Sequence, residues 1–507
     1  MGFGSIGGGV PLKPGYAPIR GECTTAISLA RQGRQSTLGK MTDTLFRLWT
    51  ASVRRAPAAI AVVDASSGKK WTRAELDDSA AAWADSFARM AGKSPIAGSR
   101  VAMSLPNGAE WFQVFLGLLS LGAAPAPIDP SEPEDAQVAA ALLIGAPWIW
   151  RASGLRAVSP AGRARSAHRR ARGECLVKLS SGSSGRPRGL SATHAQMAAD
   201  GRQVCASMGI GPDDSSLAVI PLGYSYGLGN LVVPLIVQGS RVICLASALP
   251  HAIASDARRL RPTVFPAVPP VLKALAASDV PRNSFASVRL VISAGSPLPP
   301  ELGRAFAAKF GVPVHGFYGT SETGGIAFDS TGEATLGGRS VGTPLSGVRI
   351  TFGSGGRFRV SSPAVLGKGH FSPADRARLN ERGELVLLGR TDRVVKVGGR
   401  RVDLAEIEAA LRSVPGIRDA FALAPGADGP SLCAAVATDL GAAEIRRLLR
   451  SRLAAWKIPE RFVCLREFPR TARGKCDTRK LRQVLTAPRT VTSTSTLSAE
   501  RHMSAPR

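Results

Sequence analysis

A repeated alternation of short apolar runs and amphipathic runs is the feature that most constrains how this chain can fold. Ala59–Val63 predicts a strand, and Thr72 can cap the helix that follows because a glutamate stands three residues later. Arg100–Leu105 predicts a second strand, which leads into an apolar helix over Ala109–Leu121. Alternating strands and helices are typical of parallel βα units. We therefore expect an α/β fold whose large N-terminal domain is built from stacked αβ subdomains.

The alternation gives way to other patterns further along the chain. After Gly337, short strands separated by glycine turns predict a β-rich subdomain, and past Asp392 a compact α+β module follows. The start of the chain is rich in glycine and poor in acids, which indicates either a disordered extension or an over-extended start before Met41. The end is rich in Ser, Thr and Pro, which is typical of disorder. The expected divisions are a leader over 1–40, a large domain over 41–388, a hinge over 389–393, a small mobile C-terminal domain over 394–485 and a disordered tail over 486–507.

The charge balance is strongly basic, with 65 Lys and Arg against 37 Asp and Glu and a formal net charge of +28. Such a field attracts polyanions, including nucleic acid, anionic lipid headgroups and nucleotides. The excess is spread along the chain, however, and no zinc-finger, basic-zipper or RRM signature accompanies it. We interpret it as arginine on solvated surfaces and expect no specific nucleic-acid partner.

Cysteine, histidine and hydropathy patterns exclude several other classes of protein. The seven cysteines are scattered and form no CxxC pair, which favours a reducing compartment, the cytoplasm. The six histidines show no HExxH or similar metal-ligand spacing, so the sequence predicts no zinc site. The longest apolar stretch, Trp111–Ile128, is interrupted by glycine and proline. It therefore predicts a buried helix running into a strand rather than a transmembrane segment.

A Ser/Gly loop, Ser180–Gly189, follows the predicted strand Cys175–Leu179. Small residues let backbone N–H groups and hydroxyls approach an anion closely, and Arg186 and Arg188 add positive charge. The loop is neither a Walker A motif nor a GxGxxG motif. Taken alone, such a stretch can be a linker or a phosphate cradle. The apolar strand before it favours the cradle.

Four further segments follow in sequence order, and together with the loop they resemble the signature of the adenylate-forming superfamily. This superfamily includes acyl- and aryl-CoA synthetases, the adenylation domains of peptide synthetases, and luciferases. The resemblance covers about Asp43–Leu485 and implies that the large domain is an AMP-binding domain. The segments are Ser293–Leu298, Tyr318–Gly324, Gly369–Asp375 running on to Gly389–Asp392, and Pro469–Lys475.

The resemblance implies a nucleotide site with defined roles. Tyr318 would stack on adenine, Ser321 would contact phosphate, and Glu322 would help to hold Mg²⁺. A carboxylate beside phosphates is repulsive unless a hard cation lies between them, which agrees with that role. Asp375 would bind the ribose hydroxyls, and Arg390 would contact ribose or phosphate. The full nucleotide-binding set is Ser180, Ser181, Gly182, Ser183, Ser184, Gly185, Arg188, Ser293, Ala294, Gly295, Tyr318, Gly319, Thr320, Asp375, Arg390 and Arg401.

Lys475 resembles the lysine that drives adenylation in this superfamily. Its compact ammonium can bridge the substrate carboxylate and the α-phosphate as the oxygen attacks phosphorus. Ser321 and Glu322 would complete the catalytic set, and Asp392 would be the hinge between the two domains. The implied acyl pocket comprises Tyr224, Tyr226, Gly227 and Thr323, with Leu228 and Ser293 beside them.

Three departures from the family pattern leave room for a slow, specialised or degenerate enzyme. Arg188 stands where the phosphate loop usually has lysine, which keeps the charge but not the geometry. Tyr224 replaces a common histidine that resembles a gate beside the acyl pocket. Pro373–Asp375 replaces a Thr-Gly-Asp sequence, which can shift the ribose loop.

The implied function is that of an AMP-forming acid–thiol ligase of the acyl-CoA synthetase type. ATP, with Mg²⁺, would activate a fatty or aryl acid to acyl-AMP and release pyrophosphate, and coenzyme A would then accept the acyl group. We favour these acids over an amino acid because no acidic residue is clearly placed to bind an α-amino group. One alternative is transfer to a separate acyl-carrier protein. Another is a non-catalytic protein that binds polyanions.

Overall fold

The structure is a computed structural model. It describes residues 44–92, 96–158, 172–181, 187–245, 247–390, 393–397, 400–424, 432–453, 455–471 and 476–487. The expected leader, the loop residues Gly182–Gly185, the hinge residue Asp392 and the catalytic candidate Lys475 lie outside these ranges. The fold is α/β with a large N-terminal domain and a small C-terminal domain, as the sequence predicts.

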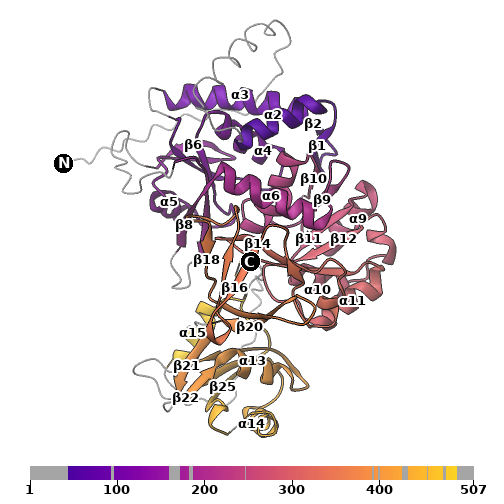
Figure 1. Ribbon diagram of the computed structural model, residues 1–507, viewed down its shortest axis with the longest axis vertical. Helices are drawn as coiled ribbons and strands as arrows, with labels where there is room; N and C mark the ends of the chain where they lie inside the picture. Colours follow the sequence, from indigo (N-terminus) through magenta and orange to yellow (C-terminus); the bar gives the residue numbers. More distant parts are fainter. Residues whose placement is uncertain are drawn as a thin grey trace, which may run out of the picture. The chain divides into compact units, whose positions relative to one another are not determined.

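A nine-stranded sheet forms the centre of the large domain (Figure 1). Its strands are β1 Ile60–Asp64, β2 Lys70–Thr72, β9 Ser215–Ala218, β10 Arg241–Cys244, β11 Val264–Ala267, β12 Leu290–Ser293, β13 Val314–Thr320, β14 Gly324–Phe328 and β15 Thr343–Pro344. They lie in the order β15-β14-β13-β12-β11-β9-β10-β1-β2. The six strands from β13 to β1 pair in parallel, whereas β2, β14 and β15 are antiparallel to their neighbours.

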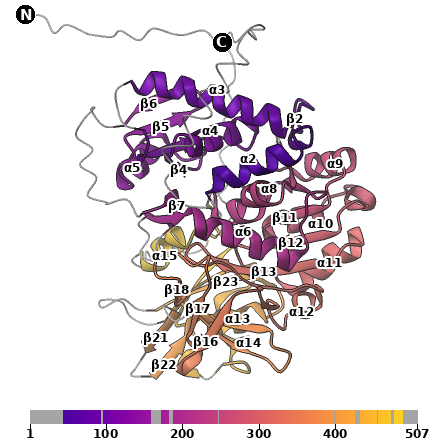
Figure 2. The ribbon, with the colours of Figure 1, turned by 45° about the horizontal axis from the view of Figure 1, so that its top comes forward.

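Helices cover both faces of this sheet (Figure 2). The helices of the large domain, not all of which pack on this sheet, are α2 Leu45–Arg55, α3 Arg73–Ala91, α4 Ala109–Ser120, α5 Glu134–Leu143, α6 His194–Met208, α7 Ser225–Gly227, the π-helical turn η1 Leu228–Val232, α8 Val233–Val237, α9 Pro250–Leu260, α10 Pro269–Ala277, α11 Pro300–Phe310 and α12 Glu333–Leu336, with short 3₁₀ turns η2 Arg282–Phe285 and η3 Ser354–Gly356. Neighbours on a strand point to opposite faces. Val264 of β11 therefore packs with residues of α6, whereas Phe265 packs with residues of α9, α10 and α11.

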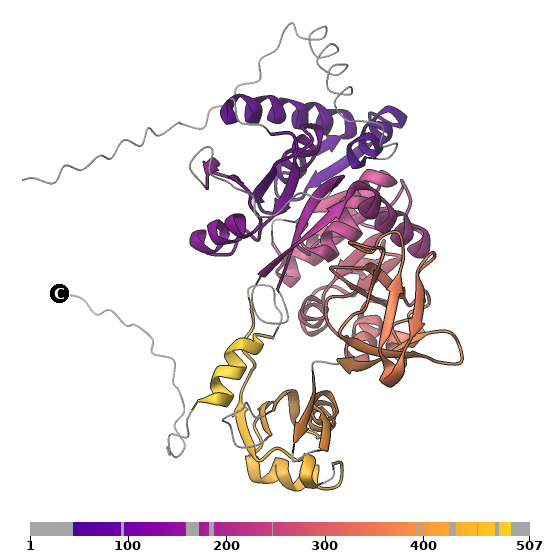
Figure 3. The same ribbon diagram turned by 60° about the vertical axis from the view of Figure 1, so that its left-hand side comes forward.

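A second sheet and a hairpin lie beside the nine-stranded sheet (Figure 3). The four-stranded sheet contains β3 Arg100–Ser104, β4 Ala124–Pro127, β5 Trp148–Arg151 and β6 Gly154–Ala157, and the hairpin pairs β7 Glu174–Ser181 with β8 Pro187–Thr193. The expected loop Ser180–Gly189 is therefore shorter than its sequence suggests. Ser180 pairs with Arg188, and Leu179 with Gly189, so the strands continue into the Ser/Gly run from both sides.

The rest of the described chain forms smaller sheets, as the glycine-turn pattern predicts. In the large domain these strands are β16 Arg349–Phe352, β17 Phe358–Ser361, β18 His370–Phe371, β19 Asp375–Leu379 and β20 Leu385–Arg390. The C-terminal part contains β21 Val394–Val397, β22 Arg400–Asp403, α13 Leu404–Arg412, β23 Ile417–Leu423, β24 Cys433–Thr438, α14 Ala442–Leu449, η5 Ala455–Lys457, β25 Arg461–Leu465 and α15 Thr478–Thr486. Its own apolar core includes Ile407, Val436 and Ile445, all fully buried. Across the described ranges, none of the helices combines the length and the apolar character that crossing a bilayer requires.

A buried ion pair joins the four-stranded sheet to the β7–β8 hairpin. Arg100 begins β3 and Glu174 begins β7. The guanidinium donates from Nε to Glu174 Oε1 at 2.7 Å and from Nη2 to Oε2 at 2.8 Å. It also donates from Nη1 to the carbonyl of Ile144 at 2.8 Å. The Glu174 side chain is fully buried, so the pair depends on this two-bond geometry.

We predict that Glu174→Gln lowers the free energy of unfolding by about 3 kcal/mol, because it leaves the Arg100 charge buried without its partner. Urea unfolding followed by circular dichroism measures the change. The control is Glu406→Gln, which removes a half-exposed partner of Lys457 and should cost less than about 1 kcal/mol. Equal effects of the two substitutions would contradict a structural role for the buried pair.

Candidate active site

The loops that follow three strands of the nine-stranded sheet meet at one edge. β9, β12 and β13 belong to the parallel part of the sheet, so their carboxyl ends lie at the same edge, where α/β sheets bind ligands. Ser225, after β9, donates from Oγ to Oγ of Ser321, after β13, at 2.9 Å. The Tyr226 hydroxyl donates to the carbonyl of Ile292 on β12 at 2.9 Å. Three segments that the sequence singles out are thus brought together.

The loop after β9 has a backbone path that is fixed from two sides. A Cβ atom at Gly227 would overlap the carbonyl oxygen of Pro221, so only glycine fits there. Asn107 donates from Nδ2 to the carbonyls of Ala218 and Ile220, at 3.2 and 2.9 Å. Its Oδ1 accepts from the backbone N–H of Leu222 at 2.9 Å. This side chain follows β3, so it ties the loop to the four-stranded sheet.

Three of the expected nucleotide-binding residues are in contact. The Tyr318 hydroxyl donates to Oδ2 of Asp375 at 2.8 Å, and Nη1 of Arg390 lies 3.9 Å from Oδ1 of the same carboxylate. Asp375 and Arg390 face each other across the β19–β20 pair. Burial, together with the neighbouring carboxylate, raises the pKa of Tyr318 well above its usual value. The phenol therefore stays protonated at neutral pH and can donate this bond.

The last residue of β12, Ser293, presents a buried hydroxyl to the same edge. Ser293 is 4% exposed, and its Oγ has no hydrogen-bond partner among the described residues. Ala294 is also buried, and Gly295 has a φ of +85°, a conformation that favours glycine. A buried polar atom without a partner costs free energy, so the Ser293 hydroxyl is suited to a ligand group.

The turn after β13 holds the expected metal ligand. Thr320 and Thr323 exchange hydrogen bonds, each backbone N–H donating to the other's Oγ1 at 3.2 Å. Ser321 and Glu322 between them are half-buried. The described residues contain no group of three or more His, Cys, Asp or Glu side chains that could hold a metal. A lone carboxylate fits Mg²⁺ that is bound mainly by substrate phosphates and water.

The remaining expected site residues are placed as follows. Ser180 is half-buried at the end of β7, Arg188 is exposed on β8, and Gly319 is exposed on β13. Gly182–Gly185 and Lys475 lie outside the described ranges. For Ser181 and Arg401 the structure describes the backbone but not the side chain. The phosphate contacts of the loop and of Lys475 therefore stay predictions.

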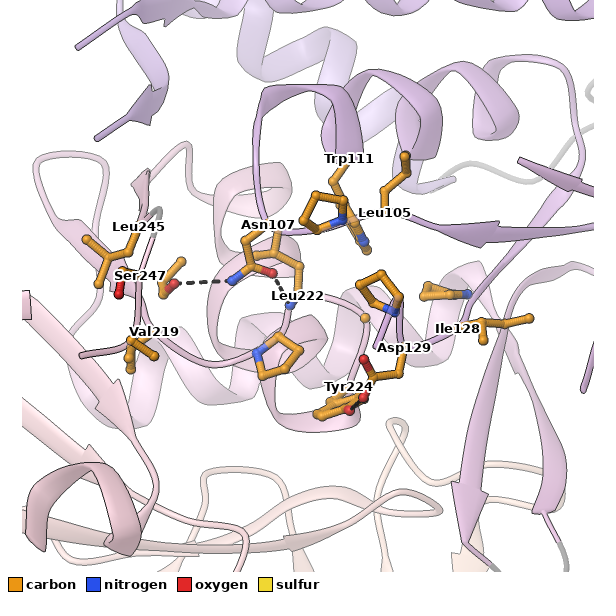
Figure 4. A pocket seen from close by; sticks show the side chains of 17 residues that line it. Leu105, Asn107, Trp111, Ile128, Asp129, Val219, Leu222, Tyr224, Leu245 and Ser247 are labelled. Carbon is orange, nitrogen blue, oxygen red and sulfur yellow. Dashed lines mark hydrogen bonds between the residues drawn. The ribbon is translucent and has the colours of Figure 1, made fainter. Parts of the chain in front are cut away.

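Tyr224 and Tyr226, which the sequence assigns to one acyl pocket, make contacts in different places. The Tyr224 hydroxyl donates to the Asp129 carboxylate, at the end of β4 (Figure 4). Both residues line a cavity of about 230 Å³ at the carboxyl ends of β3, β4, β9 and β10. Its other lining residues, which include Trp111, Ile128 and Leu245, are mostly apolar. Tyr226, Gly227 and Thr323 do not line it.

Two buried charged residues, one on β7 and one on α6, are missing from the sequence-based site. Lys178 of β7 is 3% exposed and Asp200 of α6 is 4% exposed. Burial is the largest influence on both: it lowers the pKa of Lys178 and raises the pKa of Asp200, and each charge opposes the effect on the other. A lysine inside an otherwise apolar strand was a signal that could have revealed them.

Comparison with known families agrees with this geometry. The pattern of the AMP-binding enzyme family matches residues 49–147 and 153–352, and that of the AMP-binding enzyme C-terminal domain matches residues 406–475. The chain belongs to the AMP-binding enzyme family. The resemblance to the adenylate-forming superfamily is thereby confirmed.

Curated relatives of this AMP-binding enzyme differ in what they act on. Phenyloxazoline synthase MbtB of Mycolicibacterium paratuberculosis is 29% identical, over 93% of this chain and 44% of that protein. Benzoate–CoA ligase of Thauera aromatica is 27% identical, over 61% and 65% respectively. L-proline–[L-prolyl-carrier protein] ligase of Streptomyces coelicolor is 28% identical, over 59% and 64%. The chain thus spans less than two thirds of each of these relatives.

Solved structures share the fold of this AMP-binding enzyme. ATP-bound MatB from Rhodopseudomonas palustris matches with a TM-score of 0.74 and 23% identity, over 87% of this chain and 98% of that one. The O-succinylbenzoate coenzyme A synthetase MenE from Bacillus subtilis, in complex with AMP, matches with a TM-score of 0.73 and 22% identity over the same shares. At these identities the likeness establishes the fold.

We predict that Tyr318→Phe weakens AMP binding by roughly fivefold to tenfold, because it removes the phenol hydroxyl that donates to the Asp375 carboxylate and orients it. Tyr318→Ala should weaken AMP binding further, since the ring that would stack on adenine is lost as well. Isothermal titration calorimetry with AMP measures both, and thermal melting checks that the variants fold. Wild-type affinity in Tyr318→Ala would show that this tyrosine does not contact the nucleotide.

Proposed function

We propose that this enzyme uses ATP to activate a fatty or aryl acid as an acyl-adenylate and then transfers the acyl group to a thiol, coenzyme A. One observation carries the proposal. In a chain of the AMP-binding family, Tyr318 and Asp375, which we expect to hold adenine and ribose, are in contact, and the expected metal ligand Glu322 lies in the turn after the strand of Tyr318. The unpartnered hydroxyl of Ser293 lies at the end of β12, the strand next to β13.

In the first half-reaction, a carboxylate oxygen of the acid attacks the α-phosphorus of ATP. The bond between that phosphorus and the bridging oxygen to the β-phosphate breaks, and pyrophosphate leaves. Lys475 would hold the attacking carboxylate and the α-phosphate together, which stabilises the negative charge that builds up on the phosphoryl oxygens. Glu322 would hold Mg²⁺, which supplies charge neutralisation at the phosphates when bound.

In the second half-reaction, the thiol sulfur attacks the acyl carbon, the bond to the AMP oxygen breaks, and the thiol proton passes to solvent. The small domain would swing about Asp392 between the two steps, which removes Lys475 from the site. We keep Tyr224 in the proposed acyl pocket: its hydroxyl contacts the Asp129 carboxylate, and both residues line a mostly apolar cavity.

Relatives favour an aryl acid within the proposed class. Their names include benzoate–CoA ligase, feruloyl-CoA synthase and a naphthoate–CoA ligase, at 26 to 28% identity. We keep a fatty acid as the second member of the class, because single residues of the pocket do not fix its depth. We also propose the cytoplasm as the place of action, which the scattered cysteine pattern of the sequence favours.

Transfer to a separate acyl-carrier protein is the alternative second step. One relative is a prolyl-carrier-protein ligase, and the net charge of +28 would favour an acidic protein partner. A non-catalytic polyanion-binding protein is the third reading, and the three departures from the family pattern support it. It requires salt-sensitive polyanion binding without pyrophosphate release.

We expect a screen of carboxylic acids to show acid-dependent pyrophosphate release with Mg²⁺ and ATP, largest for aryl acids. Adding coenzyme A should convert the accumulated acyl-AMP to a thioester and sustain turnover, which chromatography of the products detects. Loading of a carrier protein without turnover on coenzyme A would favour the alternative acceptor. The absence of pyrophosphate release with every acid would refute the adenylation.

We predict that Lys475→Ala lowers the rate of pyrophosphate release by at least about a hundredfold, as expected for the loss of a charge that acts in the transition state. The same variant should still convert chemically prepared acyl-AMP to the thioester, because that step does not use the lysine. Lys457→Ala is the matched control in the same domain, since its ammonium pairs with Glu406, which is not one of the expected site residues. Normal adenylation by Lys475→Ala would disprove the proposed mechanism.

A further inference from the structure

One face of α6 carries three polar side chains to which the proposed reaction gives no role. Gln196, Asp200 and Gln203 are spaced by four and then three positions, so they lie on the same side of the helix. Each is bonded to a residue 125 to 169 positions further along the chain. Gln203 accepts at Oε1 from Oγ of Ser362 at 3.0 Å, which ties this face to the segment Ser362–Leu366.

Asp200 binds the backbone that follows the expected metal ligand, Glu322. Its Oδ1 accepts from the backbone N–H of Gly325 at 3.0 Å, and the residue is 4% exposed. Gly324 has a φ of +69°, and a Cβ atom there would overlap the same carboxylate. Only glycine therefore lets the backbone approach Asp200 in this way.

The Asp200 carboxylate also contacts the loop after β9. Gly229, in the π-helical turn η1, lies against it, since a Cβ atom there would be 3.2 Å from Oδ2. Gly201 explains why α6 comes so close: a Cβ atom at this position would lie 2.3 Å from Cγ1 of Val233 on α8. Asp200 is thus held in a closely packed place, from which one carboxylate contacts two loops of the site.

The backbone of Glu322 is fixed by a second connection to the same face of α6. Its carbonyl accepts from the backbone N–H of Leu366 at 2.8 Å. The carbonyl of the preceding residue, Val365, accepts from Nε2 of Gln196 at 3.0 Å. The helix therefore supports the turn after β13 directly through Asp200 and indirectly through the segment that ends at Leu366.

A hydrogen bond is needed at this end of the turn because packing cannot hold it. Gly324 and Gly325 have no side chains that could be fixed by apolar contacts. A buried carboxylate loses its hydration, which an apolar side chain would avoid, and the Gly325 N–H offsets only part of that cost. What the carboxylate adds is a directional bond three residues after Glu322, which an apolar contact would not supply.

We propose that Asp200 is a positioning residue that holds Glu322 in place for Mg²⁺ by fixing the backbone N–H of Gly325. Since Leu366 fixes the carbonyl of Glu322, the metal ligand stands between two anchored points. Outer partners of this kind orient a ligand without touching the metal. The inference rests on the proposed function, because it requires that Glu322 holds Mg²⁺ together with ATP.

The test measures how much Mg²⁺ strengthens nucleotide binding. α,β-Methylene-ATP cannot release pyrophosphate, and isothermal titration calorimetry gives its affinity with Mg²⁺ and again with EDTA. Asp200→Ala removes the bond to Gly325, whereas Asp200→Asn keeps an oxygen that can accept it. If thermal melting shows that Asp200→Ala does not fold, Asp200→Ser takes its place, because its oxygen is one bond nearer to the helix and falls short of Gly325.

We expect Asp200→Ala to reduce the gain in affinity that Mg²⁺ gives by roughly tenfold, with the affinity in EDTA within about twofold of the wild type. Asp200→Asn should retain most of the gain. Asp214→Ala is the matched control: this buried aspartate accepts from Nη2 of Arg289 at 2.7 Å and stands before β9, at the opposite edge of the sheet. It should lower stability and leave the gain unchanged.

Parallel weakening of both affinities in a folded Asp200→Ala variant would show that the aspartate is only structural, and an unchanged gain would show that Glu322 does not depend on it. Equal losses in Asp200→Ala and Asp200→Asn would mean that the bond to Gly325 is not the cause. Each of these results refutes the inference, and a wild type that releases pyrophosphate then leaves the proposed function standing. A wild type that releases none with any acid overturns the proposed function, and the inference falls with it.

Discussion

Parallel pairing of the inner strands of the nine-stranded sheet is the constraint on which the rest of the site depends. It places the carboxyl ends of β9, β12 and β13 at one edge, so that loops from residues about 70 to 100 positions apart meet there. The bonds from Ser225 to Ser321 and from Tyr226 to Ile292 exist only because of this pairing. A family signature that is scattered along the chain becomes one surface in this way.

Buried polar contacts then connect that edge to the other layers of the domain. Arg100 and Glu174 join the four-stranded sheet to the hairpin, and Asn107 joins the same sheet to the loop after β9. Each of these groups is fully or largely paired, so the cost of its burial is offset by hydrogen bonds. The apolar cores alone would leave the relative position of these layers less strictly defined, because apolar contacts have little directionality.

Local pattern was enough to predict the elements, and it was not enough to predict their contacts. The capping box at Thr72 is present, and the helix expected over Ala109–Leu121 is observed over Ala109–Ser120. Motif spacing also selected Tyr318 and Asp375, which prove to be bonded across 57 positions. The pairing of β8 with β7 was missed because Pro187–Thr193 reads as the end of a loop when its partner strand is not considered. Long-range register of that kind is not encoded in periodicity.

The buried charges show most clearly where sequence reasoning stops. Lys178 and Asp200 are separated by 22 positions, and the only local signal is that the lysine lies in an otherwise apolar strand. Only the fold shows that both side chains are buried and that the aspartate accepts from the backbone N–H of Gly325. Retaining two charges at such a place costs desolvation energy that an apolar pair would avoid. For Asp200, part of that cost is offset by the bond to the Gly325 backbone, which fixes the end of the segment that carries Tyr318 and Glu322.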